Sequence, residues 1–355
     1  MLRVMSGKAL TYHIIGGGIA GLAAAKFIKE KNIKNKVVLY EAAAKLGGRC
    51  FSFFDAGLDR TIDNATHVIL GANKGVINLM NRPEFSGKAK FFENGTINGK
   101  FWNYKDFILL SVFNTKADEV APSLIKKLAF KLFPFLPNRL KICYSKGDLT
   151  SKLIEPLSRY TDEIKLSHKL LDFTAENDKI SLLTFNKSKV PIAPQDKIIC
   201  ALDAANYSRI FSGPKFEFNE IANIFYRTST PLTLPEDSKF IATPQNTADW
   251  IFINDDIVAA TISNSAALTE GDDELARKIW IEIRALNGLK PAFLPSYRVM
   301  RYKQATIKQD GKNNRLRPCS ANTKFKNMKL AGDWTMKNWP CCLEAAIQSA
   351  KRAVK

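Results

Sequence analysis

The chain has 355 residues, of which 46% are hydrophobic, and its formal net charge at pH 7 is +19. This length supports one large domain or two closely joined ones with a sizeable core. A basic surface favours polyanions or an anionic membrane face. Because the lysines are scattered rather than gathered in one arm, we expect no nucleic acid partner; a membrane-surface role and a mere effect of an AT-rich genome both remain open.

The cysteines and the hydropathy pattern narrow the class further. None of the six cysteines forms a C-x-x-C pair and no histidine lies at metal-ligand spacing, so we expect a reducing cytosol and no metal. The first eleven residues are too short and too polar for a secretory signal. No window approaches the ~18 apolar residues of a membrane-spanning helix. Leu124–Leu136 has the amphipathic pattern of a core helix or of a helix on a membrane surface.

A glycine motif lies close to the start of the chain. Tyr12–Ile15 reads as a buried strand, Gly16, Gly18 and Gly21 follow at G-x-G-x-x-G spacing, and Leu22–Lys31 reads as a helix. The three glycines would allow a tight turn, close approach of a pyrophosphate, and close packing of helix on strand. The helix N-terminus favours the anion. A coincidental glycine-rich turn is the alternative.

The next strand supports the nucleotide interpretation. KVVLYE ends in Glu41, about 20 residues after Gly21, where a carboxylate would accept hydrogen bonds from a ribose diol. A second glycine pair follows, Gly47 and Gly48, and then Arg49. A second close approach of backbone suits a cofactor larger than NAD, with Arg49 reaching its phosphate or flavin.

These residues carry a family resemblance. The pattern E-x-x-x-x-x-G-G-R-x-x-S from Glu41 to Ser52 resembles the FAD-dependent amine oxidase and phytoene desaturase superfamily, which includes protoporphyrinogen oxidases. The resemblance implies an α/β fold: a Rossmann-type FAD-binding domain, of the two-dinucleotide-binding-domain flavoprotein kind, with an inserted α+β substrate cap. It implies FAD as the cofactor.

The C-terminal region resembles the same superfamily. Ala331, Gly332 and Asp333 match its A-G-D motif, in which the Asp contacts the ribityl chain or the pyrophosphate. Pro340 and Glu344 are expected to begin a helix whose positive end faces the isoalloxazine ring. A turn or cap role is the alternative for Asp333.

The resemblance also implies how the chain is organised. A strand within Asp196–Phe211 returns to the FAD domain and ends at Ala201, near the cofactor; Leu170 or Leu171 would lie near adenine. We expect strands over Glu163–Phe173 and Lys179–Asn186. The FAD-binding domain would comprise residues 1–73, 143–211 and 311–355, and the substrate cap residues 74–142 and 212–310.

The two cap segments differ in their patterns. The first is rich in Phe, Lys and Leu and is expected to be largely helical. The second combines strands at Trp250–Asn254 and Ile257–Asn264 with a helix over Asp273–Asn287.

Within the superfamily, the chain is most similar to the hydroxysqualene dehydroxylases, also called squalene-associated FAD-dependent desaturases. Asp63, Asn64, His67 and Gly71 match that branch after the Arg motif, and Trp334 matches it after A-G-D. There are departures: Asp249 stands where Gln is usual, the loop 337–345 keeps only the Pro and Glu of the branch, and the chain is shorter than expected.

The resemblance implies reductive dehydroxylation of hydroxysqualene, an apolar isoprenoid alcohol, to squalene. His67 is the candidate proton donor for the leaving hydroxyl, with a satisfied polar residue beside the flavin as the alternative; Asp63 could orient it or contact the cofactor. Trp250 and Phe252 are candidates for lining the substrate tunnel. We expect a cytoplasmic protein with peripheral contact to the inner face of the cell membrane, and upstream squalene-pathway enzymes as partners.

Other functions stay open at this point. A carotenoid desaturase or a flavin amine oxidase is the main alternative. A non-catalytic remnant that keeps the nucleotide fold is the second, because the cap is short and the loop 337–345 is altered.

Overall fold

The computed structural model describes residues 9–80, 84–88, 90–93, 96–98, 101–132, 141–144, 148–229, 232–286 and 293–355. Its first layer is a five-stranded parallel sheet in the order β10-β2-β1-β14-β20. The central strands are short apolar runs, as expected where both faces of a parallel sheet are covered. The strands are β1 Thr11–Ile15, β2 Lys36–Tyr40, β10 Glu163–Lys165, β14 Lys197–Cys200 and β20 Met328–Leu330.

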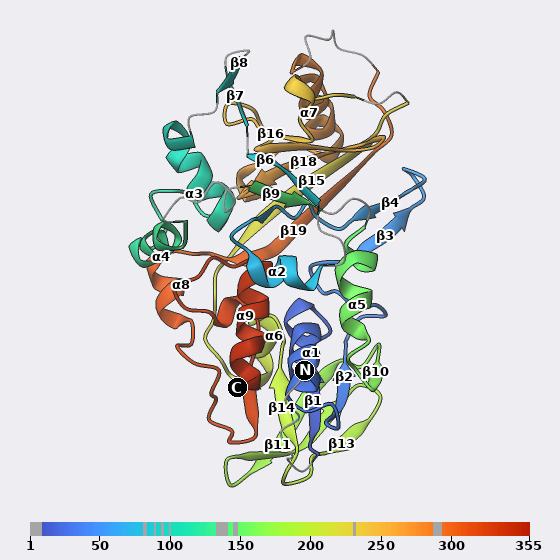
Figure 1. The fold of residues 1–355 in the computed structure, drawn as a ribbon, viewed down its shortest axis with the longest axis vertical. Helices are drawn as coiled ribbons and strands as arrows, with labels where there is room; N and C mark the ends of the chain where they lie inside the picture. Colours follow the sequence, from blue (N-terminus) through green and yellow to red (C-terminus); the bar gives the residue numbers. More distant parts are fainter. Residues whose placement is uncertain are drawn as a thin grey trace.

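Both ends of the chain contribute helices to one face of this sheet. Helix α1 (Ile19–Lys31) and helix α9 (Leu343–Val354) pack against each other; α1 also packs on β1 and β2, and α9 on β20. Figure 1 shows both chain ends in this half of the molecule. The other face is covered by α6 (Ala204–Phe211) and by the antiparallel sheet of β11 (Leu170–Glu176), β12 (Lys179–Phe185) and β13 (Lys189–Pro191).

The predicted strand–glycine turn–helix–strand unit is confirmed, with one difference in its bounds. Helix α1 begins at Ile19, not at Leu22, so Gly21 lies inside its first turn. A Cβ at Gly21 would lie 2.0 Å from the carbonyl oxygen of Gly16. Gly21 therefore serves the close packing of helix on strand.

The strand predicted over Glu163–Phe173 is wrong, because the structure divides it into β10 and β11. Ser167 between them has φ +55°, a left-handed conformation that ends extended structure. The first piece joins the parallel sheet and the second joins the antiparallel one. An alternating apolar pattern does not reveal such a change of sheet.

The second half of the molecule, the upper part of Figure 1, is built on a seven-stranded sheet in the order β19-β15-β18-β17-β16-β7-β8. Helix α7 (Asp272–Ala285) packs on one face of it through Leu275, Ile279 and Ile283. The predicted Asn287 end of this helix lies outside the described residues. The strands are β7 Phe91–Glu93, β8 Thr96–Asn98, β15 Phe218–Arg227, β16 Phe240–Ala242, β17 Trp250–Asn254, β18 Ile257–Ser263 and β19 Tyr297–Ile307.

The described residues of the first cap segment are mostly helical, as expected, but the segment also contributes strands that were not predicted. Strands β7 and β8 extend the cap sheet, and β9 joins a small sheet with β5 and β6. Such short strands leave little local signal, and β6, β7 and β9 also depend on partners distant in sequence. Residues 133–136 of the predicted amphipathic helix lie outside the described residues. The elements are β5 Ile69–Leu70, α2 Lys74–Leu79, β6 Glu84–Lys88, η1 Phe101–Tyr104, α3 Lys105–Phe113, α4 Pro122–Leu132 and β9 Lys141–Tyr144.

The remaining elements are short connections. Between β9 and β10 the chain forms one π-helical turn, followed directly by one α-helical turn. These short connecting elements are β3 Ser52–Asp55, β4 Arg60–Asp63, η3 Thr150–Ile154, α5 Glu155–Ser158, η4 Pro235–Asp237, η5 Ser265–Ala267, α8 Gly311–Leu316 and η6 Asp333–Thr335.

Candidate active site

A cavity of about 1340 Å³ lies between the two halves. It begins at the carboxyl ends of β1, β2 and β14, the edge of a parallel sheet where ligands bind in open α/β folds. It continues to the cap sheet, where β15, β17, β18 and β19 line it. Pockets for one small molecule measure about 300–1,000 Å³, so this cavity has room for a large cofactor and a second ligand.

All but one of the predicted site residues line this cavity. The exception is Gly21, which is buried in the packing of α1 on β1. The residues brought together are Gly16, Gly18, Glu41, Gly47, Gly48, Arg49, His67, Ala201, Gly332, Asp333 and Glu344.

The two glycine motifs form one cradle. Gly18 and Gly47 form a parallel bridge, and the Gly47 N–H donates to the Gly17 carbonyl at 2.9 Å. A Cβ at Gly18 would have no heavy atom closer than 3.9 Å, so packing within the protein does not demand glycine there. The open backbone beside the N-terminus of α1 is what an approaching pyrophosphate requires.

Glu41 lies directly after β2 at the edge of the cavity. Its carboxylate accepts from the Gly17 N–H at 2.7 Å and from the Ala43 N–H at 2.8 Å. Each carboxylate oxygen has two lone pairs, so both retain capacity for a ribose hydroxyl. These two amides fix the orientation of the predicted ribose ligand.

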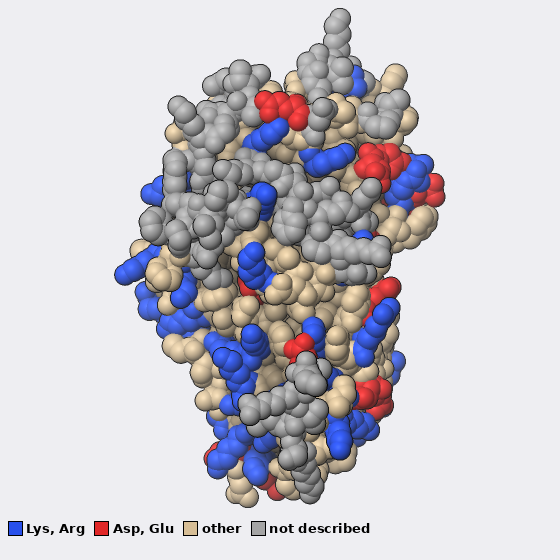
Figure 2. Space-filling model, viewed as in Figure 1, with Lys and Arg blue, Asp and Glu red and all other residues tan. Residues whose placement is uncertain are grey.

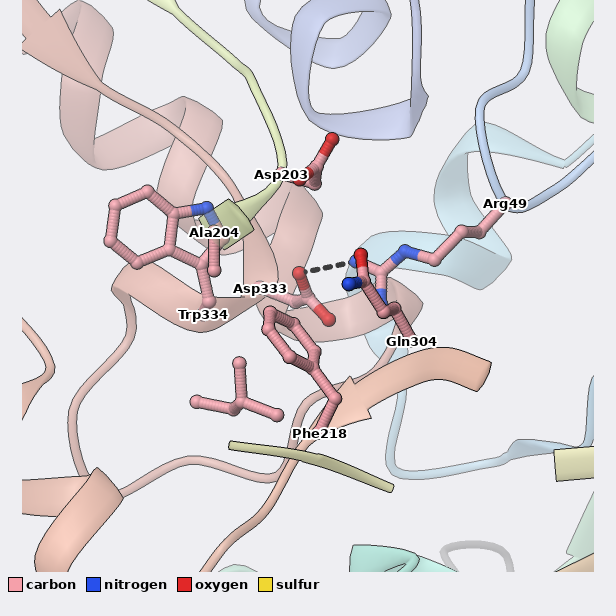
Figure 3. A pocket seen from close by; sticks show the side chains of 8 residues that line it. Arg49, Asp203, Ala204, Phe218, Gln304, Asp333 and Trp334 are labelled. Atoms are coloured by element: carbon pink, nitrogen blue, oxygen red, sulfur yellow. Dashed lines mark hydrogen bonds and ion pairs between the residues drawn. The ribbon is translucent and has the colours of Figure 1, made fainter. Parts of the chain in front are cut away.

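Arg49 and Asp333 contact each other across the cavity wall (Figure 3). The Arg49 guanidinium donates to Asp333 at 2.6 Å and to the Ala305 carbonyl at 2.6 Å. Asp333 is buried, and its charge raises the pKa of Arg49. The exposed half of the Arg49 side chain faces the cavity that it lines. The pair joins the N-terminal and C-terminal motifs.

The A-G-D loop is held from behind by Arg317, which is 1% exposed. Its guanidinium donates to the carbonyls of Asp333, Trp334 and Trp339 at 2.7–3.1 Å. The Gly332 N–H donates to the Ser349 hydroxyl on α9. The loop that carries Asp333 is thereby fixed to the helix that follows it.

Helix α9 begins at Leu343, so the expectation that Pro340 opens it is wrong. Cys342 is extended and precedes the first turn, and Pro340 lies in the loop before it. The Glu344 carboxylate accepts from the Val76 N–H at 3.0 Å and from Gln348 at 2.9 Å. Glu344 borders the cavity while joining α9 to α2, and its contact with the cofactor stays a prediction.

His67 lines the cavity beside Arg49. Its Nε2 and the Thr66 hydroxyl are buried without a hydrogen-bond partner in the part of the chain that the structure describes. Burial lowers the pKa of His67 to about 4, so the imidazole is neutral at pH 7. A neutral imidazole donates one hydrogen bond through one ring nitrogen and accepts one at the other, but it does not carry the additional proton that an imidazolium would give to a leaving hydroxyl. Both interpretations of His67, as a proton donor and as a polar residue satisfied beside the flavin, therefore stay predictions.

Asp63 has hydrogen-bond partners other than the two that we considered for it, His67 and the cofactor. Its carboxylate accepts from the Ser52 hydroxyl at 2.6 Å and from the Leu149 N–H at 3.0 Å, which ties the β3–β4 hairpin to η3. Burial raises the pKa of Asp63 to about 6. His13, in β1, lies 3.3 Å from Asp196 and 3.1 Å from the Tyr40 hydroxyl, as expected of a structural histidine.

Several lining residues were not predicted from the sequence. Of the two leucines considered for the adenine end, Leu170 lines the cavity and Leu171 does not; contact of Leu170 with adenine stays a prediction. The apolar wall of the cap was partly expected, since Trp250 and Phe252 both line it. The unpredicted residues belong to no motif. Only the cap-sheet register would have revealed those on strands, and only the packing of α3 and α4 on the cavity those on helices: Asn223, Thr261, Tyr302, Ile108, Val112 and Leu128.

The residues present fit FAD. The open backbone at Gly18, the oriented carboxylate of Glu41 and the unpartnered polar atoms of Thr66 and His67 all border one elongated cavity. The glycine turn would hold the pyrophosphate, Glu41 the ribose, and the wall from Arg49 to His67 the flavin end. The fold and the site together define a dinucleotide-binding flavoprotein.

Comparisons with known proteins place the chain in a family. Residues 147–355 match the model of the flavin containing amine oxidoreductases, and residues 14–83 match a NAD(P)-binding Rossmann-like domain. The chain belongs to the flavin containing amine oxidoreductase family. It is an FAD-dependent oxidoreductase, as the sequence motifs predicted.

Curated relatives match along nearly the whole chain. It is 25% identical to a hydroxysqualene dehydroxylase of Sinorhizobium fredii, with 96% of each chain covered, and 26% identical to one of Zymomonas mobilis, with 96% and 97% covered. The first alignment spans 409 residues, more than the 355 here, so segments of that relative have no counterpart in this chain.

Solved structures show the same fold. An oxidoreductase from Methanosarcina mazei has a TM-score of 0.70 at 13% identity, with 96% of this chain and 99% of that one covered. Cyclohexylamine oxidase from Brevibacterium oxydans also has a TM-score of 0.70, at 11% identity, with 98% of both covered. Among the described residues, no helix has the length and apolarity needed to cross a bilayer.

Proposed function

We propose that this oxidoreductase acts in isoprenoid metabolism, removing the hydroxyl of hydroxysqualene to give squalene. The observation that carries the proposal is the continuity of the cavity. It runs from the glycine cradle to an apolar wall in the cap that includes Ile108, Val112, Trp250 and Phe252. The similarity to curated hydroxysqualene dehydroxylases over 96% of the chain supports the same substrate class.

The reaction breaks the allylic C–O bond, forms a C–H bond at carbon, and releases the hydroxyl with one proton as water. Reduced FAD, when bound, would supply the hydride and would itself be oxidised. The chain's own residues hold the apolar substrate against the cap wall and exclude water that would recapture an allylic cation. His67 is placed on the same wall as Arg49, where its free Nε2 can bind the leaving oxygen.

The alternatives make different demands on the site. An amine oxidase binds a cationic or amine-bearing substrate, and a carotenoid desaturase binds a hydrocarbon and removes hydrogen. The buried, neutral His67 and the apolar cap wall favour an uncharged substrate over an amine. The polar groups on the cap face favour an oxygen-bearing substrate over a hydrocarbon.

The test is a single-turnover assay. FAD-loaded protein reduced with dithionite under anaerobic conditions is mixed with hydroxysqualene, and squalene is measured by gas chromatography with mass spectrometry. We expect squalene in step with flavin reoxidation. Oxidation of added amines with hydrogen peroxide release, or desaturation of phytoene without squalene formation, would assign one of the alternatives. Protein that never binds FAD would support the non-catalytic remnant.

A further inference from the structure

The cap face of the cavity is a sheet surface whose register brings polar side chains together. Asn223 on β15 lies opposite Thr261 on β18, and Ile221, two residues earlier, lies opposite Ser263 on β18 and Tyr302 on β19. All five border the cavity, next to the aromatic wall of Trp250 and Phe252. This face is therefore apolar with a small polar centre.

Most of the polar groups on this face already have partners. Trp250 Nε1 donates to the Ser111 hydroxyl at 2.9 Å. The Ser263 hydroxyl contacts Asp249, and the Tyr302 hydroxyl contacts Asn64, whose amide donates to the Arg49 carbonyl. These groups fix the cap sheet to the segments around it.

Asn223 differs from its neighbours. Its side chain is 0% exposed, and the Thr261 hydroxyl donates to its Oδ1 at 2.9 Å, which fixes the plane of the amide. Its Nδ2 is buried and has no hydrogen-bond partner in the described part of the chain. A buried amide without a partner costs free energy that a ligand oxygen would recover.

We propose that Asn223, oriented by Thr261, is the binding residue for the hydroxyl of an otherwise apolar ligand, and that it makes the cavity prefer an isoprenoid alcohol to the matching hydrocarbon. The inference rests on the proposed function for the ligand class. It adds a selectivity that the function does not require: once the oxygen has left, the product no longer binds Asn223. Product release is thereby favoured over product retention.

The experiment measures equilibrium binding and needs no turnover. Dissociation constants of the FAD-loaded protein for farnesol and for farnesene are obtained from the change in flavin absorbance or tryptophan fluorescence. We expect wild-type protein to bind the alcohol about tenfold more tightly than the hydrocarbon, the size of one good neutral hydrogen bond. Asn223→Leu, of similar size but without the amide, is expected to reduce this ratio to about one.

Two further variants keep the test decisive. Asn223→Ala also removes the amide and serves if the Leu variant does not fold. Asn219→Leu is the matched control on the same strand, because the Asn219 amide already donates to the Asn114 carbonyl and the Thr115 hydroxyl and does not border the cavity. Asn219→Leu is expected to lower stability and to keep the alcohol-to-hydrocarbon ratio.

The outcomes separate this inference from the proposed function. A wild-type ratio of one, or a ratio unchanged in both Asn223 variants, overturns the role of Asn223. A ratio lost in those variants, together with no squalene in the single-turnover assay, supports the hydroxyl site and rejects hydroxysqualene as substrate. A ratio lost equally in Asn219→Leu would also overturn it, since the effect would then be structural.

Discussion

Asp249 illustrates at the scale of one residue how burial sets a charge state. It stands beside the cap face, is 9% exposed, and accepts from the Ser263 N–H at 2.5 Å. Burial raises its pKa from 3.8 to about 6, against the lowering effect of the Ser263 hydrogen bonds. Ionisation of this carboxyl therefore opposes folding. The cost is absent below about pH 4, grows as the pH rises to about 6, and is constant above that.

We predict that Asp249→Asn stabilises the protein. Asn keeps an acceptor for the Ser263 N–H and cannot ionise, so the free energy of unfolding should rise by about 1–3 kcal/mol at about pH 8. The gain should be roughly half as large at about pH 5, where the buried carboxyl is mostly protonated. Urea denaturation at the two pH values measures both.

Asp255→Asn is the matched control for that substitution. Asp255 is exposed and lies in the turn between β17, which Asp249 directly precedes, and β18. It has φ +54°, a conformation that Asn adopts readily. Its replacement should leave stability unchanged at both pH values. An Asp249→Asn protein less stable than wild type at about pH 8 would contradict the prediction, because the carboxylate would then stabilise the fold.

Site residues could be predicted from the sequence where binding of one ligand requires several residue types at fixed spacing in one short segment. Gly16, Gly18, Glu41 and Arg49 were predicted from spacing, and all border one cavity. Asn223 was not predicted, because a single asparagine in an apolar strand has no spacing to identify it. Its significance depends on Thr261, brought opposite by strand pairing, and on a neighbouring cavity.

At the scale of elements, the turn between β1 and α1 separates two uses of glycine. A Cβ at Gly18 would meet nothing closer than 3.9 Å, whereas one at Gly21 would lie 2.0 Å from the Gly16 carbonyl. The first glycine leaves space in the cavity and the second is required by the packing of the element.

We predict that the two alanine variants affect different properties, FAD affinity in Gly18→Ala and protein stability in Gly21→Ala. Gly18→Ala should leave the melting temperature of FAD-free protein unchanged and weaken FAD binding by about 10- to 100-fold, since the methyl occupies space beside the pyrophosphate. Gly21→Ala should destabilise the FAD-free protein by at least about 2 kcal/mol, because backbone must move. Thermal denaturation without cofactor and FAD titration by fluorescence measure the two effects. Unaltered FAD affinity in Gly18→Ala would place the pyrophosphate elsewhere.

The elements that were predicted correctly carry their own local signal. The central parallel strands β1, β2 and β14 are buried apolar runs, and α7 has apolar residues at helical spacing. The strands of the first cap segment were missed because β6–β9 are three to five residues long, and β6, β7 and β9 pair with segments far away in sequence. The break at Ser167 was missed because a switch between sheets preserves the alternation of side chains.

At the scale of the whole molecule, the cavity is closed only when distant parts of the chain meet. Arg49 and Asp333 lie 284 residues apart and form one ion pair, and α1 packs on α9. The sequence predicted this meeting of the two ends from two motifs. The shape of the cavity could not be predicted, because the cap sheet that closes it is assembled from non-adjacent segments.

Surface charge and the position of α4 bear on where such a cavity would receive an apolar ligand. Figure 2 shows Lys and Arg spread over both the upper and lower parts of one face, with Asp and Glu among them. On α4, Leu124 is buried and Leu128 lines the cavity, while Lys126 and Phe130 are exposed, Phe130 at 76%. Residues four apart share one side of a helix. Helix α4 therefore presents an aromatic and a cationic side chain outward beside the cavity.

We propose that an anionic bilayer is the partner of this helix face, because lysine is attracted to acidic headgroups and an exposed phenylalanine partitions into the interface. The protein should float with vesicles containing about one-third phosphatidylglycerol, less so as salt screens the attraction. Phe130→Ser should weaken binding roughly tenfold or more, the free energy of exposing one buried Phe side chain.

Phe54→Ser is the matched control, because Phe54 is 62% exposed on the β3–β4 hairpin, away from the cavity lining. This variant should float as wild type does, since an apolar side chain acts only where it meets the lipid. Equal loss in both variants would show general surface apolarity instead of docking through α4. If the wild-type protein remains at the bottom of the gradient with anionic and with neutral vesicles alike, a membrane partner is excluded, and the net charge of +19 then needs another explanation.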